Sequence, residues 1–168
     1  EELGHAGEVA ELNEEALGWW NLDNGNILYA SISGNVTEYS VSNDIYSEVW
    51  SYSINKTLYS ADQNLGLNRI AFGTDSGVSV ISTNYQDELY SISIGSRVDG
   101  LTWDRDDDLW VTNAQNRVAS EYTGSIPVTG LSTSTHNQVI TDVISLADGS
   151  IVTSGRDKDI RVHDENGD

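Results

Sequence analysis

Hydrophobic and polar residues alternate in short runs along most of this chain, as in "ILYASIS", "VTEYSVS", "ELYSISI" and "IRVHD". The runs are rich in β-branched and aromatic residues and are bounded by Gly, Asn, Asp and Ser, which indicates many short antiparallel strands. Helical patterns are nearly absent. Only "EVAELNEEAL", at 8–17, could form a helix, and its place in the repeat described next favours a strand. The pattern predicts an all-β fold.

The strand pattern recurs along the chain with a period of roughly 40 residues, which lies in the range of known repeat architectures. Three similar segments carry evenly spaced glutamates, at Glu8, Glu48 and Glu88. A second strand recurs at nearly the same spacing, at Val36, Val78, Val118 and Ile160. A third does so at Ile27, Ile70, Leu109 and Ile151. A unit of this length with four short strands is typical of one blade of a β-propeller.

The repeats divide a single domain, residues 1–168, into four units at approximately 13–54, 55–95, 96–131 and 132–168. The last unit stops after its third strand, and the lone strand at 8–12 resembles the fourth strand which that unit lacks. We therefore predict a propeller of about four four-stranded blades. Either strand 8–12 closes the ring by completing the last blade, or the chain is part of a larger propeller; both arrangements protect the end blades from edge-to-edge association.

The segment "HNQVITDVISLADGSIVTSGRDKDIRVHD", at 136–164, resembles the WD-repeat family. His136 stands at the histidine of that repeat, Asp157 at the aspartate of its second turn, and His163-Asp164 at its tryptophan–aspartate pair. Thr135 departs from the pattern, since a glycine is usual there, and so does His163. The other three units match less well and look as much like quinoprotein-type propellers.

The resemblance has structural implications for the last unit. It implies a hydrogen bond between His136 and Asp157. The two histidines, His136 and His163, could form a His–Asp relay with Asp157 or Asp164, but a turn-stabilising network of these four residues is the preferred interpretation. Asp157 then turns the chain between two strands, and Ile160 and Val162 are expected to point into the core between sheets. Losing one partner of a buried pair leaves a polar group unsatisfied, at a cost of about 1–3 kcal/mol.

The charge balance is strongly acidic, with 27 acidic and 8 basic residues and a net charge of −19. Self-repulsion of this size destabilises a compact state in dilute buffer, and about molar salt screens most of it. The composition therefore indicates a protein of a halophilic archaeon or of its virus, with an ordinary acidic domain as the alternative. The surplus argues against nucleic-acid binding and against docking on anionic membranes. No apolar run approaches the length of about 20 residues that spans a bilayer.

One acidic cluster could bind a metal ion. Asp104, Asp106, Asp107 and Asp108 stand in "WDRDDDLW", and their carboxylates suit a hard cation such as calcium. The alternative is a solvated hairpin turn, because the same place in other repeats holds "LDNGN" and "LADGS". No cysteine, serine elbow or phosphate-binding loop is present, so the sequence identifies no catalytic residue.

Tryptophans and asparagines complete the candidate residues. Trp19 and Trp20 are adjacent on a predicted strand, so one indole should face inward and the other outward. The remaining tryptophans are expected to pack between blades, at Trp50, Trp103 and Trp110. Asn35 and Asn55 begin glycosylation acceptor patterns, which apply only outside the cell. Val36, beside Asn35, should face the core.

These observations favour a non-catalytic interaction or scaffold propeller that binds other proteins, itself or a larger assembly. An extracellular, cell-surface or virion location in high salt is preferred to the cytoplasm. The alternative is an enzyme or ligand-binding propeller, with a divalent cation or a substrate at the Asp-rich loop or in the central channel. Fold alone does not decide between them.

Overall fold

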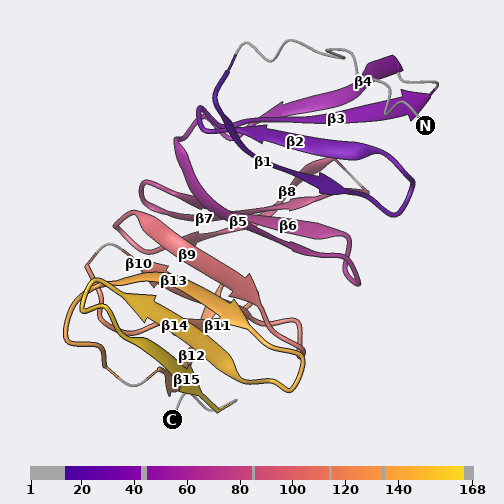
Figure 1. The fold of residues 1–168 in the computed structure, drawn as a ribbon. Helices are drawn as coiled ribbons and strands as arrows, with labels where there is room; N and C mark the ends of the chain where they lie inside the picture. The colour runs from indigo at the N-terminus through magenta and orange to yellow at the C-terminus, as the bar shows by residue number, and fades with distance from the viewer. Residues whose placement is uncertain (1–13, 43–44, 85, 114, 134, 165–168) are drawn as a thin grey trace, which may run out of the picture.

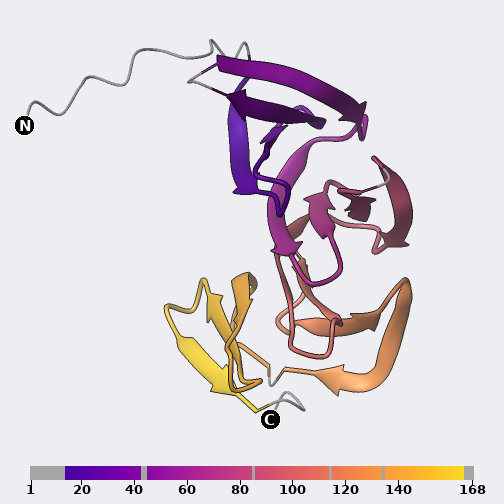
Figure 2. The same ribbon diagram turned by 90° about the vertical axis from the view of Figure 1, so that its right-hand side faces the viewer.

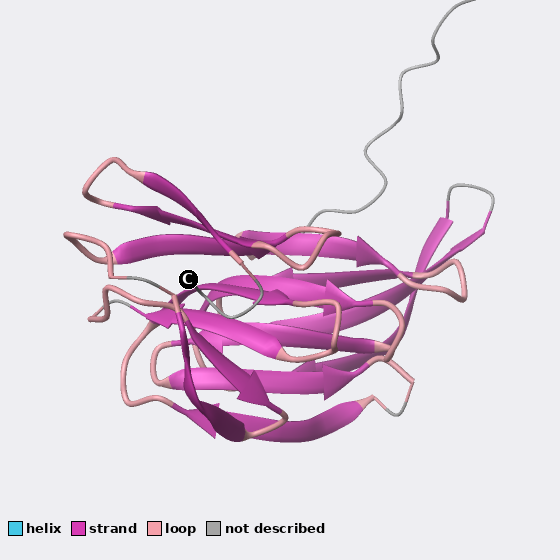
Figure 3. Ribbon diagram, turned by 90° about the horizontal axis from the view of Figure 1, so that it is seen from below, coloured by secondary structure: helices cyan, strands magenta, loops and turns pink. Residues whose placement is uncertain are grey.

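The computed structural model describes residues 14–42, 45–84, 86–113, 115–133 and 135–164. This part of the chain forms β-strands joined by short loops and contains no helix (Figure 3). Accordingly, it has no helix that could cross a membrane. The predicted strand at 8–12 lies outside the described residues.

The strands form four antiparallel sheets, each built from consecutive strands. The first sheet contains β1 (Ala16–Asn21), β2 (Ile27–Ser31), β3 (Asn35–Ser42) and β4 (Ile45–Ser53). The second contains β5 (Leu58–Asn64), β6 (Arg69–Thr74), β7 (Gly77–Ser82) and β8 (Asp87–Ser93). The third contains β9 (Val98–Trp103), β10 (Leu109–Asn113), β11 (Ser120–Thr123) and β12 (Ile126–Ser132). The fourth has three strands, β13 (Ile140–Ser145), β14 (Ile151–Gly155) and β15 (Ile160–His163).

The sheets pack face to face like the blades of a propeller. Figure 1 shows them stacked in chain order, and Figure 2 shows that they follow an arc with a gap between the first and fourth sheets. The first strand of each sheet lies on the inner side of the arc, where β5 and β9 contact each other, β9 contacts β13, and β1 contacts β5. The described residues thus form an all-β propeller array of four blades.

The core consists of three apolar layers, one between each pair of neighbouring blades. Trp50 lies in the layer between the first and second blades, Trp103 in the next, and Trp110 in the layer between the third and fourth. Each of these tryptophans is buried. The prediction that they pack between blades is therefore confirmed, as is the burial of Val36.

The paired tryptophans point in opposite directions, as expected for neighbours on one strand. Trp19 is 72% exposed. Trp20 faces the second blade, where its ring meets Phe72 edge-on at 5.8 Å between centroids.

The expected burial of Ile160 and Val162 is wrong. These side chains are 75% and 67% exposed, whereas Val78 and Val80, at the same places in the second blade, are buried. The register identifies the equivalence, because Val80 pairs with Ala71 and Val162 pairs with Val152. The third blade covers the valines of the second. No described blade follows the fourth, so its corresponding face is open.

A β-bulge recurs near the start of each inner strand. One residue is skipped in the pairing of β1 with β2, of β5 with β6, of β9 with β10 and of β13 with β14. The skipped residues are Leu17, Tyr59, Asp99 and Thr141, which follow one another at the spacing of the sequence repeat. A bulge bends its strand and redirects one side chain out of the alternation.

Candidate functional site

The inner strands enclose a central groove of about 380 Å³. All four bulge residues line it, together with Trp20 and Asp142 among others. Its lining comes from the first strand of each blade, which is where propellers have their central channel. Its position therefore results from the repeated bulge, which supplies one lining side chain from each blade.

Charge in the central groove is concentrated on one side. Arg97 lies beside Asp99, with 2.6 Å between its Nη2 and Asp99 Oδ1. The Arg97 guanidinium also stands 5.0 Å from the centroid of the Tyr59 ring. Asp142 Oδ1 accepts a hydrogen bond from the Val143 amide at 2.9 Å. This arrangement could hold a small polar or cationic ligand, but it brings together no nucleophile and base among the described lining residues.

A second polar constellation lies inside the fourth blade, in the segment that resembles a WD repeat. His136 Nδ1 is 3.0 Å from Asp157 Oδ1, in accordance with the hydrogen bond that the resemblance implies. His136 Nε2 is 2.8 Å from Thr153 Oγ1, and Thr153 Oγ1 is 2.9 Å from His163 Nε2. The two imidazoles and the hydroxyl are buried. We refer to Asp157, His136, Thr153 and His163 as the turn network.

The turn network fixes the β14–β15 turn. Asp157 accepts further hydrogen bonds from the amides of Asn137 and Asp159. The His136 hydrogen bond, followed by that of the Asn137 amide, lowers the pKa of Asp157 to about 2 against the opposing effect of burial. The contact thus contributes stability above pH 3.8, and this contribution is lost as the pH falls through about 2.

Close packing surrounds the turn network. A Cβ atom on Gly155 would lie 2.6 Å from Asp157 Oδ1 and 2.7 Å from His136 Nδ1, so only glycine fits there. Asp164 follows β15 with an exposed side chain. The imidazoles and the hydroxyl of the network are buried within one blade, where their polar atoms are paired with one another.

The Asp-rich segment forms a hairpin turn. Asp104 Oδ1 accepts hydrogen bonds from the amides of Asp106 and Asp108, at 2.9 and 3.0 Å, and Asp104 Oδ2 accepts one from Trp110 Nε1 at 3.1 Å. Asp107 turns the chain with φ 66° and accepts a hydrogen bond from Asn64 of the second blade. Among the described residues, no group of three or more acidic or histidine side chains could hold a metal ion. The calcium hypothesis for Asp104, Asp106 and Asp108 gains no support from this geometry.

A buried glutamate lies beside this turn, and nothing in its sequence surroundings distinguishes it. Glu121 on β11 is buried, and its Oε2 atom has no hydrogen-bond partner. Burial, and after it the negative charge of Asp104, raises the pKa of Glu121 to about 7. Glu38 occupies the same place on β3 and is also buried, but it accepts hydrogen bonds from Trp50 Nε1 and from the amide groups of Asn24 and Asn26.

The two glycosylation candidates differ in their surroundings. Asn35 is half-buried, and its amide nitrogen donates to both carboxylate oxygens of Glu14, at 2.9 and 3.0 Å. Asn55 is exposed between β4 and β5 with φ 57°, and its amide nitrogen donates to the Ser53 carbonyl at 3.1 Å. Asn55 is therefore the more accessible of the two.

Comparison with known proteins finds similar structures but no similar sequences. No family model matches the sequence, and no curated protein does. The structure is similar to that of U3-55K, with a TM-score of 0.73 and 13% identity, over 93% of this chain and 54% of that one. It is similar to the WD40 repeats of RRP9, with a TM-score of 0.72 and 12% identity, over 93% of this chain and 53% of that one. A third similar structure is the computationally designed Ika4 protein, with a TM-score of 0.71 and 12% identity, over 92% of this chain and 93% of that one.

These similarities establish that the chain has a β-propeller fold, similar to that of WD40-repeat structures. The chain spans about half the length of the two WD40 proteins and nearly the full length of the designed protein. Its array of four blades therefore corresponds to part of the first two structures.

Proposed function

We propose that this chain is a non-catalytic scaffold that binds other proteins. The observation that carries the proposal is a contrast between polar and apolar side chains. Groups that could perform chemistry, such as His136, His163 and Glu121, are buried inside the array. Large aliphatic side chains are exposed instead, among them Ile126 at 70% and Leu65 at 52%. Contiguous exposed apolar patches mark sites of protein interaction, and these side chains are the candidate members of such patches.

We further propose that the scaffold works in high salt, as a cell-surface, extracellular or virion component of a halophilic system. The net charge of −19 supports this, because compactness then requires screening. The exposed Asn55 would be the glycosylation site in that location. Mass spectrometry of the native protein tests this assignment. A glycan on Asn55 that is lost in Asn55→Gln supports an extracytoplasmic location, and an unmodified Asn55 counts against glycosylation there.

The scaffold role is tested by affinity capture in about molar salt, with the wild-type chain and two variants as baits. Leu65→Asp and Ile126→Asp each place a charge on an exposed aliphatic position away from the first and last blades. We expect a partner captured by the wild type to be lost with at least one variant, while circular dichroism shows both variants folded. Asn84→Asp, an exposed polar position, is the matched control for added charge. Failure to capture any protein would contradict the scaffold role.

A ligand-binding role is the second candidate, and the central groove is the observation that favours it. The groove presents Asp99, Asp142 and the ring of Tyr59 to a ligand of small size. Melting with calcium or magnesium, compared with melting in EDTA, separates the two roles. A ligand that binds only the folded state raises the melting temperature with its concentration. A metal-dependent rise that is removed by Asp142→Asn would favour the groove, whereas equal curves would favour the scaffold.

A further inference from the structure

The fourth blade has an apolar free face made of Ile144, Val152, Ile160 and Val162. Register pairing places these residues on one side of the sheet, since Ile144 pairs with Val152 and Val152 pairs with Val162, while Ile160 lies two residues before Val162. Three of them are exposed, Ile160 at 75%, Val162 at 67% and Ile144 at 49%. The equivalent side of the second blade carries Ala71, Val78 and Val80, which the third blade buries. The face of the fourth blade is thus built for packing between blades.

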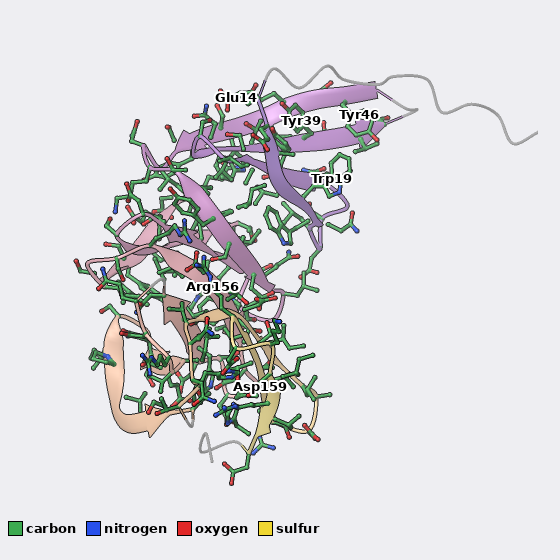
Figure 4. All side chains as sticks on the ribbon, turned by 60° about the vertical axis from the view of Figure 1, so that its left-hand side comes forward. Glu14, Trp19, Tyr39, Tyr46, Arg156 and Asp159 are labelled. Atoms are coloured by element: carbon green, nitrogen blue, oxygen red, sulfur yellow. The ribbon has the colours of Figure 1, made fainter. Side chains whose placement is uncertain are left out.

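The first blade has the complementary free face, made of Trp19, Ile27 and Tyr39. Asn21 pairs with Ile27, Ile27 pairs with Tyr39, and Trp19 lies two residues before Asn21, so all three point to one side. The same side of the second blade carries Ala61, Ile70 and Ile81, which pack against the first blade. Trp19 is equivalent to Ala61, which faces the blade before its own. No described blade precedes the first, and Trp19 is 72% exposed. Figure 4 shows Trp19 and Tyr39 on the first blade, with Tyr46 nearby on β4.

One contact between the two faces would place opposite charges together. Arg156 begins the β14–β15 turn, and Arg161 of β15 is already paired with Asp157 and Asp159 of that turn. In the fourth blade, Gly155 pairs with the first residue of β13, and Arg156 comes next in the chain. In the first blade, Ser31 pairs with the first residue of β1, and Ile32 comes next, so Arg156 and Ile32 are equivalent. The Ile32 carbonyl accepts a hydrogen bond from Leu58, the first residue of the next inner strand, at 2.8 Å. A blade docked in the same way would bring Ala16, and with it Glu14 and Glu15, beside Arg156.

We propose that a second copy of this chain covers both free faces. The fourth blade of each copy packs against the first blade of the other, and the two copies close one ring of eight blades. The curvature supports this occupant, because 93% of the chain superposes on 54% and 53% of the two WD40 chains. A ring on that scale needs somewhat less than twice the blades present here, and two copies are the whole number of chains nearest to it. Two identical contacts between unlike faces close a ring by a twofold axis.

Ring closure also completes the central groove. The groove is lined by one bulge residue from each of the four blades, and the ribbon of the single array leaves a gap between the first and fourth blades (Figure 2). The second copy would supply its own Leu17, Tyr59, Asp99 and Thr141 to the same axis. The inference depends on the fold alone, so it can fail while the scaffold function stands, and the reverse is also true.

Light scattering of the complete chain in about molar salt, where the Debye length is about 3 Å, tests the proposal. We expect a particle of twice the chain mass of 18.3 kDa. Val162→Asp on one face and Trp19→Ser on the other should each halve that mass, while circular dichroism shows that the sheets persist. Ile126→Asp makes the same kind of change on an exposed position of the third blade and should leave the mass unchanged.

Cross-linking identifies the contact directly, because the chain has no cysteine of its own. Ile27 and Val162 correspond to Leu109 and Val80, which share the apolar layer between the second and third blades. A mixture of Ile27→Cys and Val162→Cys chains, treated with a bismaleimide spanning about 10 Å, the spacing of packed sheets, should yield a product of twice the chain mass. Ile126→Cys mixed with Val162→Cys is the matched control and should yield none.

Three results would overturn the proposal. A mass of one chain in high salt would show that the faces stay open or are covered by other blades. A cross-link within single chains of the Ile27→Cys, Val162→Cys double variant would show that the first and fourth blades of one copy meet. A particle larger than two copies would show that the contact repeats without closing at two. Each of these outcomes differs from the loss of partner capture that would contradict the scaffold role.

Discussion

At the scale of single residues, Thr153 has the most constrained position in the turn network. Its hydroxyl lies between two imidazole nitrogens and has one proton to donate. The hydroxyl can therefore donate to only one of the two imidazoles and must accept from an N–H group of the other. Both contacts are made only when one ring presents Nε2–H and the other presents a lone pair at Nε2, so Thr153 couples the two histidines.

Removing the Thr153 hydroxyl should therefore destabilise the fold. Thr153→Val keeps the shape of the side chain but leaves two buried imidazole nitrogens without their partner. We expect the free energy of unfolding to fall by about 1–3 kcal/mol, measured by urea titration in high salt. Thr57→Val, at an exposed threonine, should change it by less than about 0.5 kcal/mol. Equal values for the two variants would contradict the contribution of the turn network to stability.

Glu121 makes a prediction about pH. Its carboxyl titrates near 4.5 in the unfolded chain and near 7 in the fold. The carboxyl of Glu121 therefore stays protonated to a higher pH in the folded state than in the unfolded state. The free energy of unfolding should decrease as the pH rises from about 4.5 to about 7. Glu121→Gln should flatten this decrease and make the protein more stable than the wild type at pH 8, by about 1–3 kcal/mol. Denaturation series at several pH values measure both effects, with the exposed Glu48→Gln as control. A wild type whose stability does not fall across this window would refute the assignment.

The sequence could identify only part of these sites. His136 and Asp157 stood in a recognisable spacing, so their contact could be expected. Thr153 could have been found from its alternation with Ile151, which places a polar side chain on a buried face and requires a partner for it. Glu121 could not, because its burial depends on how the third and fourth blades pack, and its strand carries no signal that separates it from the many surface glutamates.

At the scale of elements, the strands followed from alternation and turn residues, and the period of the repeat fixed how they group into blades. Two features did not follow. The inward direction expected for Ile160 and Val162 assumed a neighbouring blade on both sides, which the fourth blade lacks among the described residues. The bulges at Leu17, Tyr59, Asp99 and Thr141 left no mark in the pattern, since a single extra residue in a short strand resembles ordinary alternation shifted by one position.

The β14–β15 turn supplies a prediction for an element. In Gly155→Ala, the new Cβ atom would lie within 2.7 Å of both Asp157 Oδ1 and His136 Nδ1, and both atoms belong to the turn network. The turn must open to make room, so we expect a loss of about 1–3 kcal/mol in the free energy of unfolding. Gly66→Ala is the control, because its nearest neighbour would be 3.5 Å away. Native stability in Gly155→Ala would mean that the turn adapts without breaking the network.

At the scale of the whole molecule, charge determines the conditions for folding. With a net charge of −19, the array should unfold as the ionic strength falls, because the Debye length grows from about 3 Å at 1 M to about 30 Å at 0.01 M. Tryptophan fluorescence during dialysis follows this directly, since Trp50, Trp103 and Trp110 are buried between blades. A spectrum unchanged at low salt would remove the argument for a halophilic setting.

The repeated bulge has a consequence for the way such a protein can change. Because a backbone kink sets the direction of residues 17, 59, 99 and 141, their side chains line the groove instead of following the alternation of the strands, and Leu17 alone of the four also packs against an apolar layer. The set includes an aliphatic, an aromatic, an acidic and a hydroxyl side chain, as would be expected if the sheets imposed little choice. Substitutions at these positions could therefore change the lining of the central groove one blade at a time. Histidines, for example, could be introduced from several blades while the blades keep their packing.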